Sequence, residues 1–158
     1  MRQSGWIILD KDSGLFSRTA GGRIARMLGT KKFGHIGTLD PMATGVLPVL
    51  IGRAVKASDF ITAENKRYTA EMRLGITTDT EDTTGTVLEE KPVHVSREQL
   101  LAVLEQFRGE IEQIPPMYSA LKVNGQKLYD LARQGKEVAR KSRKITIFRL
   151  ECLNFQGS

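Results

Sequence analysis

The sequence has little of several residue types on which common protein classes depend. Its 158 residues include one cysteine and two histidines, which excludes an intrachain disulfide and leaves too few ligands for a common structural zinc site. We therefore expect no metal and a reducing, cytoplasmic setting. No run approaches the roughly 18 apolar residues that a membrane-spanning helix needs, so we also expect no membrane partner.

What the chain does contain is enough apolar material for one core. Of its 158 residues, 40% are hydrophobic, which suits a single domain of ordinary size better than two. We therefore expect residues 1–158 to belong to one domain.

Charge is distributed unevenly along the chain. The residues up to Gly75 hold 12 Lys/Arg against 6 Asp/Glu, those up to Ser119 hold 3 against 9, and the rest hold 9 against 3. Two basic segments therefore flank an acidic one. This pattern fits an ordinary solvated surface, and it also fits a face that binds a polyanion such as RNA.

Short apolar or alternating runs predict the strands. They cover Trp6–Asp10, Val46–Ile51, Tyr68–Leu74, Thr86–Leu88 and Lys144–Leu153. In the third of these runs, Tyr68 is predicted to start the apolar face of a half-buried strand.

Helix-start and helix-stop residues predict the helices between these strands. The expected segments are a helix capped by Ser17 and stopped by Gly29, an amphipathic segment at Arg53–Ile61, a helix with a Ser96/Gln99 capping box and a buried stripe that ends at Gly109, and a short helix at Leu128–Arg133 closed by Gly135. Strands and helices alternate without a regular βαβ repeat. We therefore predict an α+β fold with a mixed, mostly antiparallel sheet and flanking helices.

The stretch Thr30–Gly45 has glycines, a proline and no clear periodicity, so it is predicted to be a structured loop and a candidate site. In the plainest interpretation it is a tight connection in which Asp40 caps a turn and Pro41 fixes its φ. A phosphate-binding loop has little support, since the GxxxxGK[ST] and GxGxxG patterns are absent. An aspartyl phosphotransferase is disfavoured because Met42 stands where its second aspartate belongs.

The run GHIGTLDPMATGVLPVLIG, Gly34–Gly52, resembles the signature around the catalytic aspartate of TruB-type tRNA pseudouridine synthases. Three further blocks agree in order and approximate spacing: Gly5–Lys11, Lys66–Gly85 and Gln113–Gly135. The resemblance implies a pseudouridine synthase catalytic domain that isomerises one uridine in the T arm of tRNA to pseudouridine. It implies no cofactor, because the net reaction consumes no electrons, water or energy source.

The resemblance also implies roles for individual residues. Asp40 matches the catalytic carboxylate, which attacks the ribose or the base once the base is turned out of its stack. Tyr68 matches the tyrosine that stacks on the target base, although a core aromatic is the plain alternative. His35 matches a histidine that holds the extruded nucleotide, and is otherwise a turn residue. Lys11 matches a lysine that supports the active-site loop, and is otherwise solvated.

Within the second matching block, Lys66 and Arg67 are further candidates for RNA contacts. Two departures from the family pattern accompany these matches. Asp12 stands where the family usually has proline, and the later segment that gives the aspartate a basic partner, with the usual C-terminal RNA-binding domain, is not in the sequence. We therefore expect a partial catalytic domain whose full-length form is monomeric. The alternatives are a catalytically silent tRNA-binding fragment and a structural protein that binds no RNA.

Overall fold

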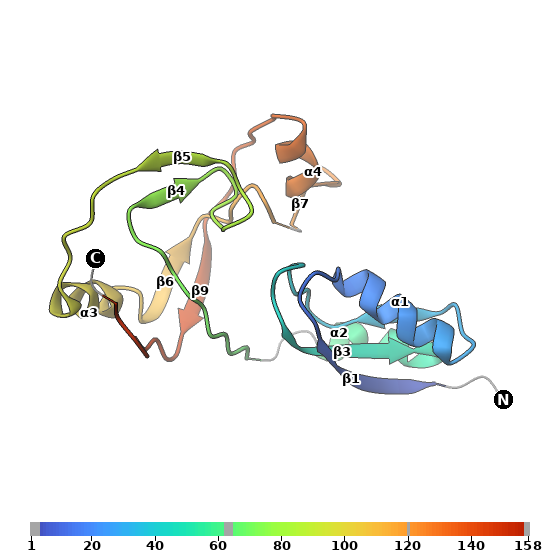
Figure 1. Ribbon diagram of the computed structural model, residues 1–158. Helices are drawn as coiled ribbons and strands as arrows, with labels where there is room; N and C mark the ends of the chain where they lie inside the picture. Colours follow the sequence, from blue (N-terminus) through green and yellow to red (C-terminus); the bar gives the residue numbers. More distant parts are fainter. Residues whose placement is uncertain (1–3, 62–64, 120, 157–158) are drawn as a thin grey trace. The chain divides into compact units, whose positions relative to one another are not determined.

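Two apolar runs of the sequence form the longest antiparallel ladder in the computed structural model, which describes residues 4–61, 65–119 and 121–156. Strand β1 (Gly5–Lys11) pairs with β3 (Gly45–Ile51) from end to end, with Gly5 opposite Ile51 and Lys11 opposite Gly45. The short strand β2 (Phe33–His35) lies on the other edge of β3 (Figure 1). The two strands predicted from apolar runs in this part of the chain are confirmed.

The chain divides into two compact units, Met1–Thr69 and Ala70–Ser158. The expectation of a single domain stays a prediction. None of the helices in the described residues is long and apolar enough to cross a membrane.

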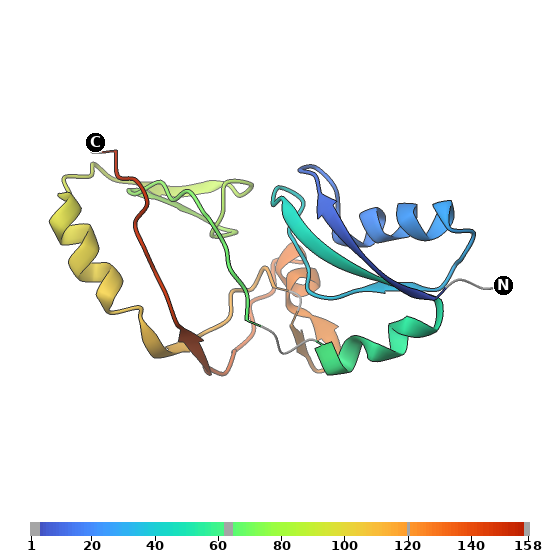
Figure 2. The ribbon, with the colours of Figure 1, turned by 90° about the horizontal axis from the view of Figure 1, so that it is seen from below.

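In the first unit, helices cover both faces of the three-stranded sheet (Figure 2). Helix α1 (Ser17–Met27) packs on one face, where buried residues form the core: Ala20, Ala25, Leu47, Val49 and Ile51. The 3₁₀ segment η1 (Gly52–Ala57) and α2 (Ser58–Ile61) follow β3 in the predicted amphipathic stretch, and η1 contacts all three strands.

Glycines allow close packing on both faces of this sheet. A Cβ on Gly21 of α1 would lie 3.2 Å from the ring of Phe33, and one on Gly34 would lie 3.4 Å from Val55 of η1. Since neighbouring residues of a strand face opposite sides, α1 and η1 lie against opposite faces of β2.

The predicted end of helix α1 is confirmed, but its predicted cap is wrong. Gly29 adopts a φ of 63°, and the amides of Gly29 and Thr30 donate to the carbonyls of Arg26 and Ala25 in a Schellman motif. At the other end, the N-cap residue is Phe16, which makes no side-chain capping bond. The hydroxyl of Ser17 is not available to cap the helix because it bonds to the main chain of Leu39.

The described residues of the second unit form three antiparallel strand pairs and two helices. The elements are β4 (Ile76–Thr78) with β5 (Val87–Glu90), β6 (Gly109–Gln113) with β9 (Arg143–Ile147), β7 (Lys122–Val123) with β8 (Gln126–Lys127), α3 (Arg97–Glu105) and α4 (Leu128–Arg133). All strand pairs within the described residues of the chain are antiparallel, and the α+β class is confirmed.

The strand predicted at Tyr68–Leu74 is wrong. Residues 65–73 form neither helix nor strand, and Tyr68 is 69% exposed. An alternating pattern predicts which side chains share a face, but a strand also needs a partner, and the ladder with β5 begins only at Ile76. Two more predictions need correction, because β2 lies within the supposed loop Thr30–Gly45 and β9 is shorter than Lys144–Leu153.

The capping box of α3 is confirmed, since Ser96 accepts from the Gln99 amide and the Gln99 side chain accepts from the Ser96 amide. Its buried stripe is wrong, because none of the helix's residues is buried. The helix ends at Glu105, and Gly109 starts β6 instead of closing the helix.

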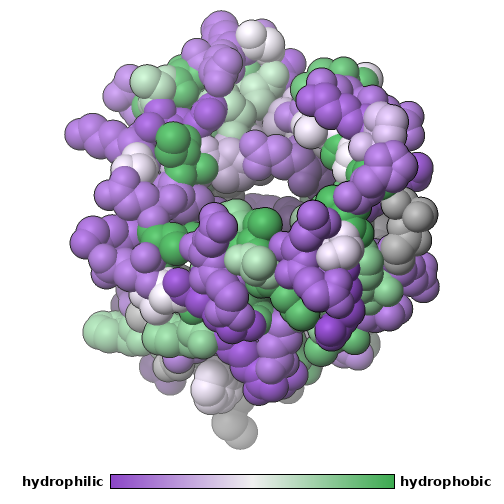
Figure 3. Space-filling model, turned by 90° about the vertical axis from the view of Figure 1, so that its left-hand side faces the viewer, coloured by the Kyte–Doolittle hydropathy of each residue, from purple (hydrophilic) through white to green (hydrophobic). Residues whose placement is uncertain are grey.

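The face of the molecule in Figure 3 is largely hydrophilic, with apolar residues scattered between polar ones.

Candidate active site

Asp40 lies on the loop that connects β2 to β3, and its side chain is exposed. Its carbonyl accepts a hydrogen bond from the Ala43 amide at 3.0 Å, with Pro41 in the second position of the resulting turn. The tight connection expected from the sequence is therefore present. The turn is closed by the main chain of Asp40, so this bond leaves the carboxylate uninvolved.

The residue before Asp40 is held by the start of α1. The buried hydroxyl of Ser17 donates to the Leu39 carbonyl at 2.8 Å and accepts from the Leu39 amide at 3.0 Å. The side chain of Leu39 also packs against the core of the first unit. Leu39 is thus fixed through both its main chain and its side chain.

The two residues after the aspartate are held by the loop that follows β1. The Pro41 carbonyl accepts from the Gly14 amide at 2.8 Å and from Lys11 Nζ at 3.2 Å. The Met42 carbonyl accepts from the Ser13 hydroxyl at 3.1 Å. Contacts on both sides therefore restrict the backbone that carries the aspartate.

Lys11 is buried, with 1% of its surface exposed, so the alternative of a solvated lysine is wrong. Its ammonium group donates to the carbonyls of Asp12 and Leu15, each at 2.9 Å, in addition to that of Pro41. An ammonium group has three donors, and these three carbonyls match that number. The bond to Pro41 connects the end of β1 to the loop of Asp40. A lysine that supports this loop needs such a connection.

His35 is the last residue of β2, opposite Val49 of β3, and is partly buried. Its Nδ1 is buried and has no hydrogen-bond partner within the described residues. A buried polar atom without a partner is uncommon in folded proteins and calls for an explanation.

Lys66, Arg67 and Tyr68 are all exposed on the irregular stretch at the end of the first unit. Among the described residues, no hydrogen bond or ion pair joins them to the loop of Asp40. The structure thus brings Lys11 to that loop, whereas the nearness of these three to Asp40 stays a prediction.

Asp82, in the turn between β4 and β5, is a carboxylate with a different environment. It accepts hydrogen bonds from the hydroxyls of Thr80 and Thr84, at 2.7 and 2.6 Å, and from the Thr84 amide at 2.8 Å. Burial alone raises the pKa of the Asp82 carboxyl, but the bonds from Thr84 and Thr80 lower the pKa below its usual value. This turn is also tight, because a Cβ on Gly85 would collide with side-chain oxygens of Asp79 and Thr80.

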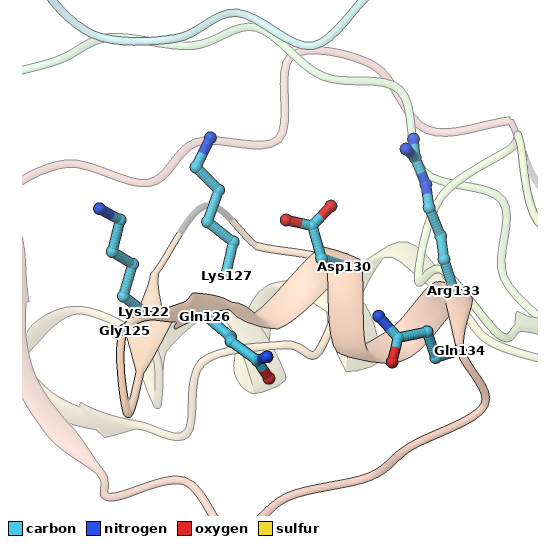
Figure 4. Close-up of a pocket in the computed structure, with 7 residues that line it drawn as sticks. All are labelled: Lys122, Gly125, Gln126, Lys127, Asp130, Arg133 and Gln134. Atoms are coloured by element: carbon cyan, nitrogen blue, oxygen red, sulfur yellow. The ribbon is translucent and has the colours of Figure 1, made fainter.

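The β7–β8 hairpin and α4 line an open hollow of about 600 Å³. It is lined by polar side chains and one glycine: Lys122, Gly125, Gln126, Lys127, Asp130, Arg133 and Gln134. Figure 4 shows the three cationic side chains standing on the same side of the hairpin and helix, together with Asp130. The Lys127 ammonium also donates to the Tyr129 hydroxyl at 2.9 Å.

Sequence reasoning missed two features of these sites. The hairpin turns at Asn124 and Gly125, which have φ values of 50° and 82°. Asn-Gly is a strong hairpin signal and was visible in the sequence. The link between Ser17 and Leu39 had no such signal, because it joins residues 22 positions apart.

Within the described residues, no group of three His, Cys, Asp or Glu side chains could hold a metal ion.

Comparison with known proteins shows the family to which this chain belongs. Residues 25–158 match the model of the N-terminal domain of the TruB family pseudouridylate synthases, and the chain belongs to this family. The tRNA pseudouridine synthase B of Stutzerimonas stutzeri is 53% identical over 154 residues, which are 98% of this chain and 50% of that protein. The proteins of the same name from Clostridium kluyveri and Vibrio cholerae are 47% and 48% identical over 96% and 97% of this chain. The chain spans about half the length of these curated relatives.

The fold also resembles a solved structure. A chain in the crystal structure of a Cbf5-Nop10-Gar1 complex superposes with a TM-score of 0.62 and 25% identity, covering 97% of this chain and 36% of that one. The α+β arrangement described above is therefore shared with a known fold.

Proposed function

We propose that the protein carrying this chain isomerises one uridine in the T arm of tRNA to pseudouridine, with the carboxylate of Asp40 as the nucleophile. Membership of the TruB family and relatives named tRNA pseudouridine synthase B support the reaction and the tRNA substrate. The T arm and the role of Asp40 come from the resemblance of the residues around Asp40 to the family signature.

The observation that carries the proposal is the geometry of the Asp40 loop. A nucleophilic carboxylate must be reachable by the substrate and still keep a defined position. Asp40 is exposed, while bonds from Ser17, Gly14 and Lys11 hold its two neighbours. In the reaction the carboxylate forms a bond to the ribose or the base, and the N1–C1′ bond between base and sugar breaks. When C5 of the base joins C1′, the bond to the carboxylate breaks, the proton on C5 leaves and N1 takes up a proton.

The other family matches take supporting roles in this proposal. The exposed ring of Tyr68 stacks on the extruded base, and His35, with its buried Nδ1 lacking a partner in the described residues, holds the extruded nucleotide. Lys66 and Arg67, both exposed, contact RNA phosphates. Lys11 holds the loop of Asp40 through its bond to the Pro41 carbonyl.

The cationic hollow of the second unit is a further candidate surface for RNA. Lys122, Lys127 and Arg133 line it and belong to the second basic segment of the sequence. Cationic side chains on one side of a groove attract the phosphate backbone without reading sequence.

The test uses a full-length protein that carries this chain and an unmodified tRNA transcript. After incubation, the tRNA is digested and pseudouridine is located by mass spectrometry. We expect one pseudouridine in the T arm, and none in a transcript in which cytidine replaces that uridine. Product at other positions, or no product from an otherwise folded enzyme, would contradict the proposed reaction or its position.

A further inference from the structure

Helix α1 begins in an unusual way, because a serine at its start does not cap it. Phe16 takes the N-cap position and makes no side-chain capping bond. Ser17, the first helical residue, is 3% exposed and its hydroxyl bonds to a loop 22 positions later in the chain. Serine side chains near a helix start commonly satisfy free amides of the first turn, so this hydroxyl serves another purpose.

The bonds of Ser17 satisfy both main-chain groups of one residue. Its hydroxyl donates to the Leu39 carbonyl at 2.8 Å and accepts from the Leu39 amide at 3.0 Å. A hydroxyl has a single proton to donate, and here that proton goes to Leu39. Alanine at this position would leave the amide and the carbonyl of Leu39 without these partners.

Leu39 is joined to Asp40 by one peptide bond, so what fixes Leu39 limits where Asp40 can lie. Consecutive Cα atoms are about 3.8 Å apart across a trans peptide. On the far side of Asp40, the ring of Pro41 restricts φ and its carbonyl is bonded to Gly14 and Lys11. With the Ser17 bonds removed, Leu39 would keep only the packing of its side chain against the core, and the main chain next to Asp40 would be bonded on one side of that residue only.

We propose that Ser17 is a positioning residue for Asp40, acting through the main chain of Leu39. This inference rests on the proposed function, in which the Asp40 carboxylate attacks the substrate. Misplacement of a reacting group by about 1 Å can cost on the order of 10²-fold in rate. The bonds of Ser17 therefore contribute to the chemical step, and RNA binding does not depend on them.

The kinetic test compares Ser17→Ala and Ser17→Cys in a full-length protein, by single-turnover pseudouridine formation and by the Kd for tRNA. We expect Ser17→Ala to lower the rate constant roughly 10- to 100-fold and to change Kd less than about twofold. Cysteine has a larger sulfur atom in place of the oxygen but keeps a weak donor and a weak acceptor, so Ser17→Cys should retain more activity than Ser17→Ala. Thr19→Ala, at an exposed position of the same helix, is the matched control and should change neither quantity.

A rate within about twofold of the parent in folded Ser17→Ala would overturn the proposal. Equal losses in the alanine and cysteine variants, or a parallel loss of tRNA binding, would also overturn it, since both indicate a general structural role. Thermal unfolding identifies any variant that is not folded at the assay temperature.

Amide hydrogen exchange tests the same inference without any activity. In Ser17→Ala we expect the Leu39 amide to lose protection, while the Ile36 amide, which donates to the Pro48 carbonyl at 3.0 Å, stays protected. Unchanged protection of Leu39 would contradict the positioning role. Because this readout does not involve Asp40 chemistry, it remains informative if Asp40→Asn keeps its activity and the proposed function fails.

Discussion

Two aspartates of this chain lie in tight turns between strands, yet their turns are held in opposite ways. The turn of Asp40 is held by residues 22 to 30 positions away, and none of those bonds uses the Asp40 carboxylate. The turn of Asp82 is held by the Asp82 carboxylate itself, through bonds to Thr80 and Thr84 two positions away. A carboxylate that holds its own turn is already engaged in hydrogen bonds. When bonds from residues far along the chain hold the turn, its backbone is fixed and the carboxylate stays exposed.

The largest effect concerns a fragment that consists of residues 1–158 alone. The family resemblance implies that a later segment supplies the cationic partner of the aspartate, and removal of one such electrostatic partner costs roughly 10²- to 10³-fold in rate. We expect a loss of at least that size in single-turnover assays with T-arm RNA, while salt-dependent binding persists. A rate comparable to that of a full-length relative would show that this chain supplies the partner itself, with Arg140, Lys141 and Arg143 the first residues to test.

Replacement of Tyr68 should have a smaller effect on the chemistry. Stacking on a base is worth roughly 1–3 kcal/mol, so Tyr68→Leu should lower the single-turnover rate roughly 5- to 150-fold in the full-length protein. Tyr68→Phe keeps the ring and should lose less. If both variants were equally and completely inactive, the phenolic hydroxyl and not stacking would be the important group.

The cationic hollow should affect binding and not chemistry. A double variant Lys122→Gln and Lys127→Gln in the full-length protein should weaken tRNA binding and reduce the slope of log K against log salt by about 1 to 2. The rate at saturating tRNA should stay within about twofold. Lys91→Gln serves as the control, since Lys91 is exposed and pairs with Glu89 at 2.9 Å. An unchanged salt slope would exclude the hollow from the tRNA interface.

The smallest effect concerns the turn of Asp82 and distinguishes it from the turn of Asp40. Because the folded-state pKa of Asp82 lies below its usual value of 3.8, the ionised carboxylate stabilises its turn above that pH. This stabilisation is lost as the pH falls through the lowered pKa. A titration followed by NMR should give a midpoint below 3.8 for Asp82, and Asp82→Ala should expose the Thr84 amide to exchange without exposing that of Leu39. A midpoint at or above the usual value would mean that the hydrogen bonds of the turn do not favour the charged form.

The sequence was sufficient for elements whose signals are local. Apolar runs located β1 and β3, glycines located the ends of α1 and α4, and the Ser96 capping box located α3. Each of these signals depends on residues within one or two turns of the chain, where sequence spacing fixes geometry.

Features that depend on distant partners could not be read in this way. Short strands such as β2 and β6 exist because β3 and β9 pair with them. Tyr68 is not in a strand, because the pairing with β5 begins only at Ile76. At the candidate site, the resemblance predicted roles for Asp40, His35 and Lys11, but nothing in the sequence predicted the bond from Ser17 to Leu39. A single hydroxyl that joins a helix to a loop leaves no periodic trace in the sequence.

The most direct test of Asp40 as the nucleophile is Asp40→Asn in a full-length protein, with Asp12→Asn as the control. Asp12 is also exposed and lies in the loop after β1, and its carbonyl bond to Lys11 does not need its carboxylate. An amide nearly matches the shape of a carboxylate but cannot act as the nucleophile. We expect Asp40→Asn to lose at least roughly 10²-fold in single-turnover rate with an unchanged unfolding temperature, and Asp12→Asn to keep the parental rate. An Asp40→Asn enzyme that kept more than about a tenth of the parental rate would contradict the assignment of Asp40 as the nucleophile.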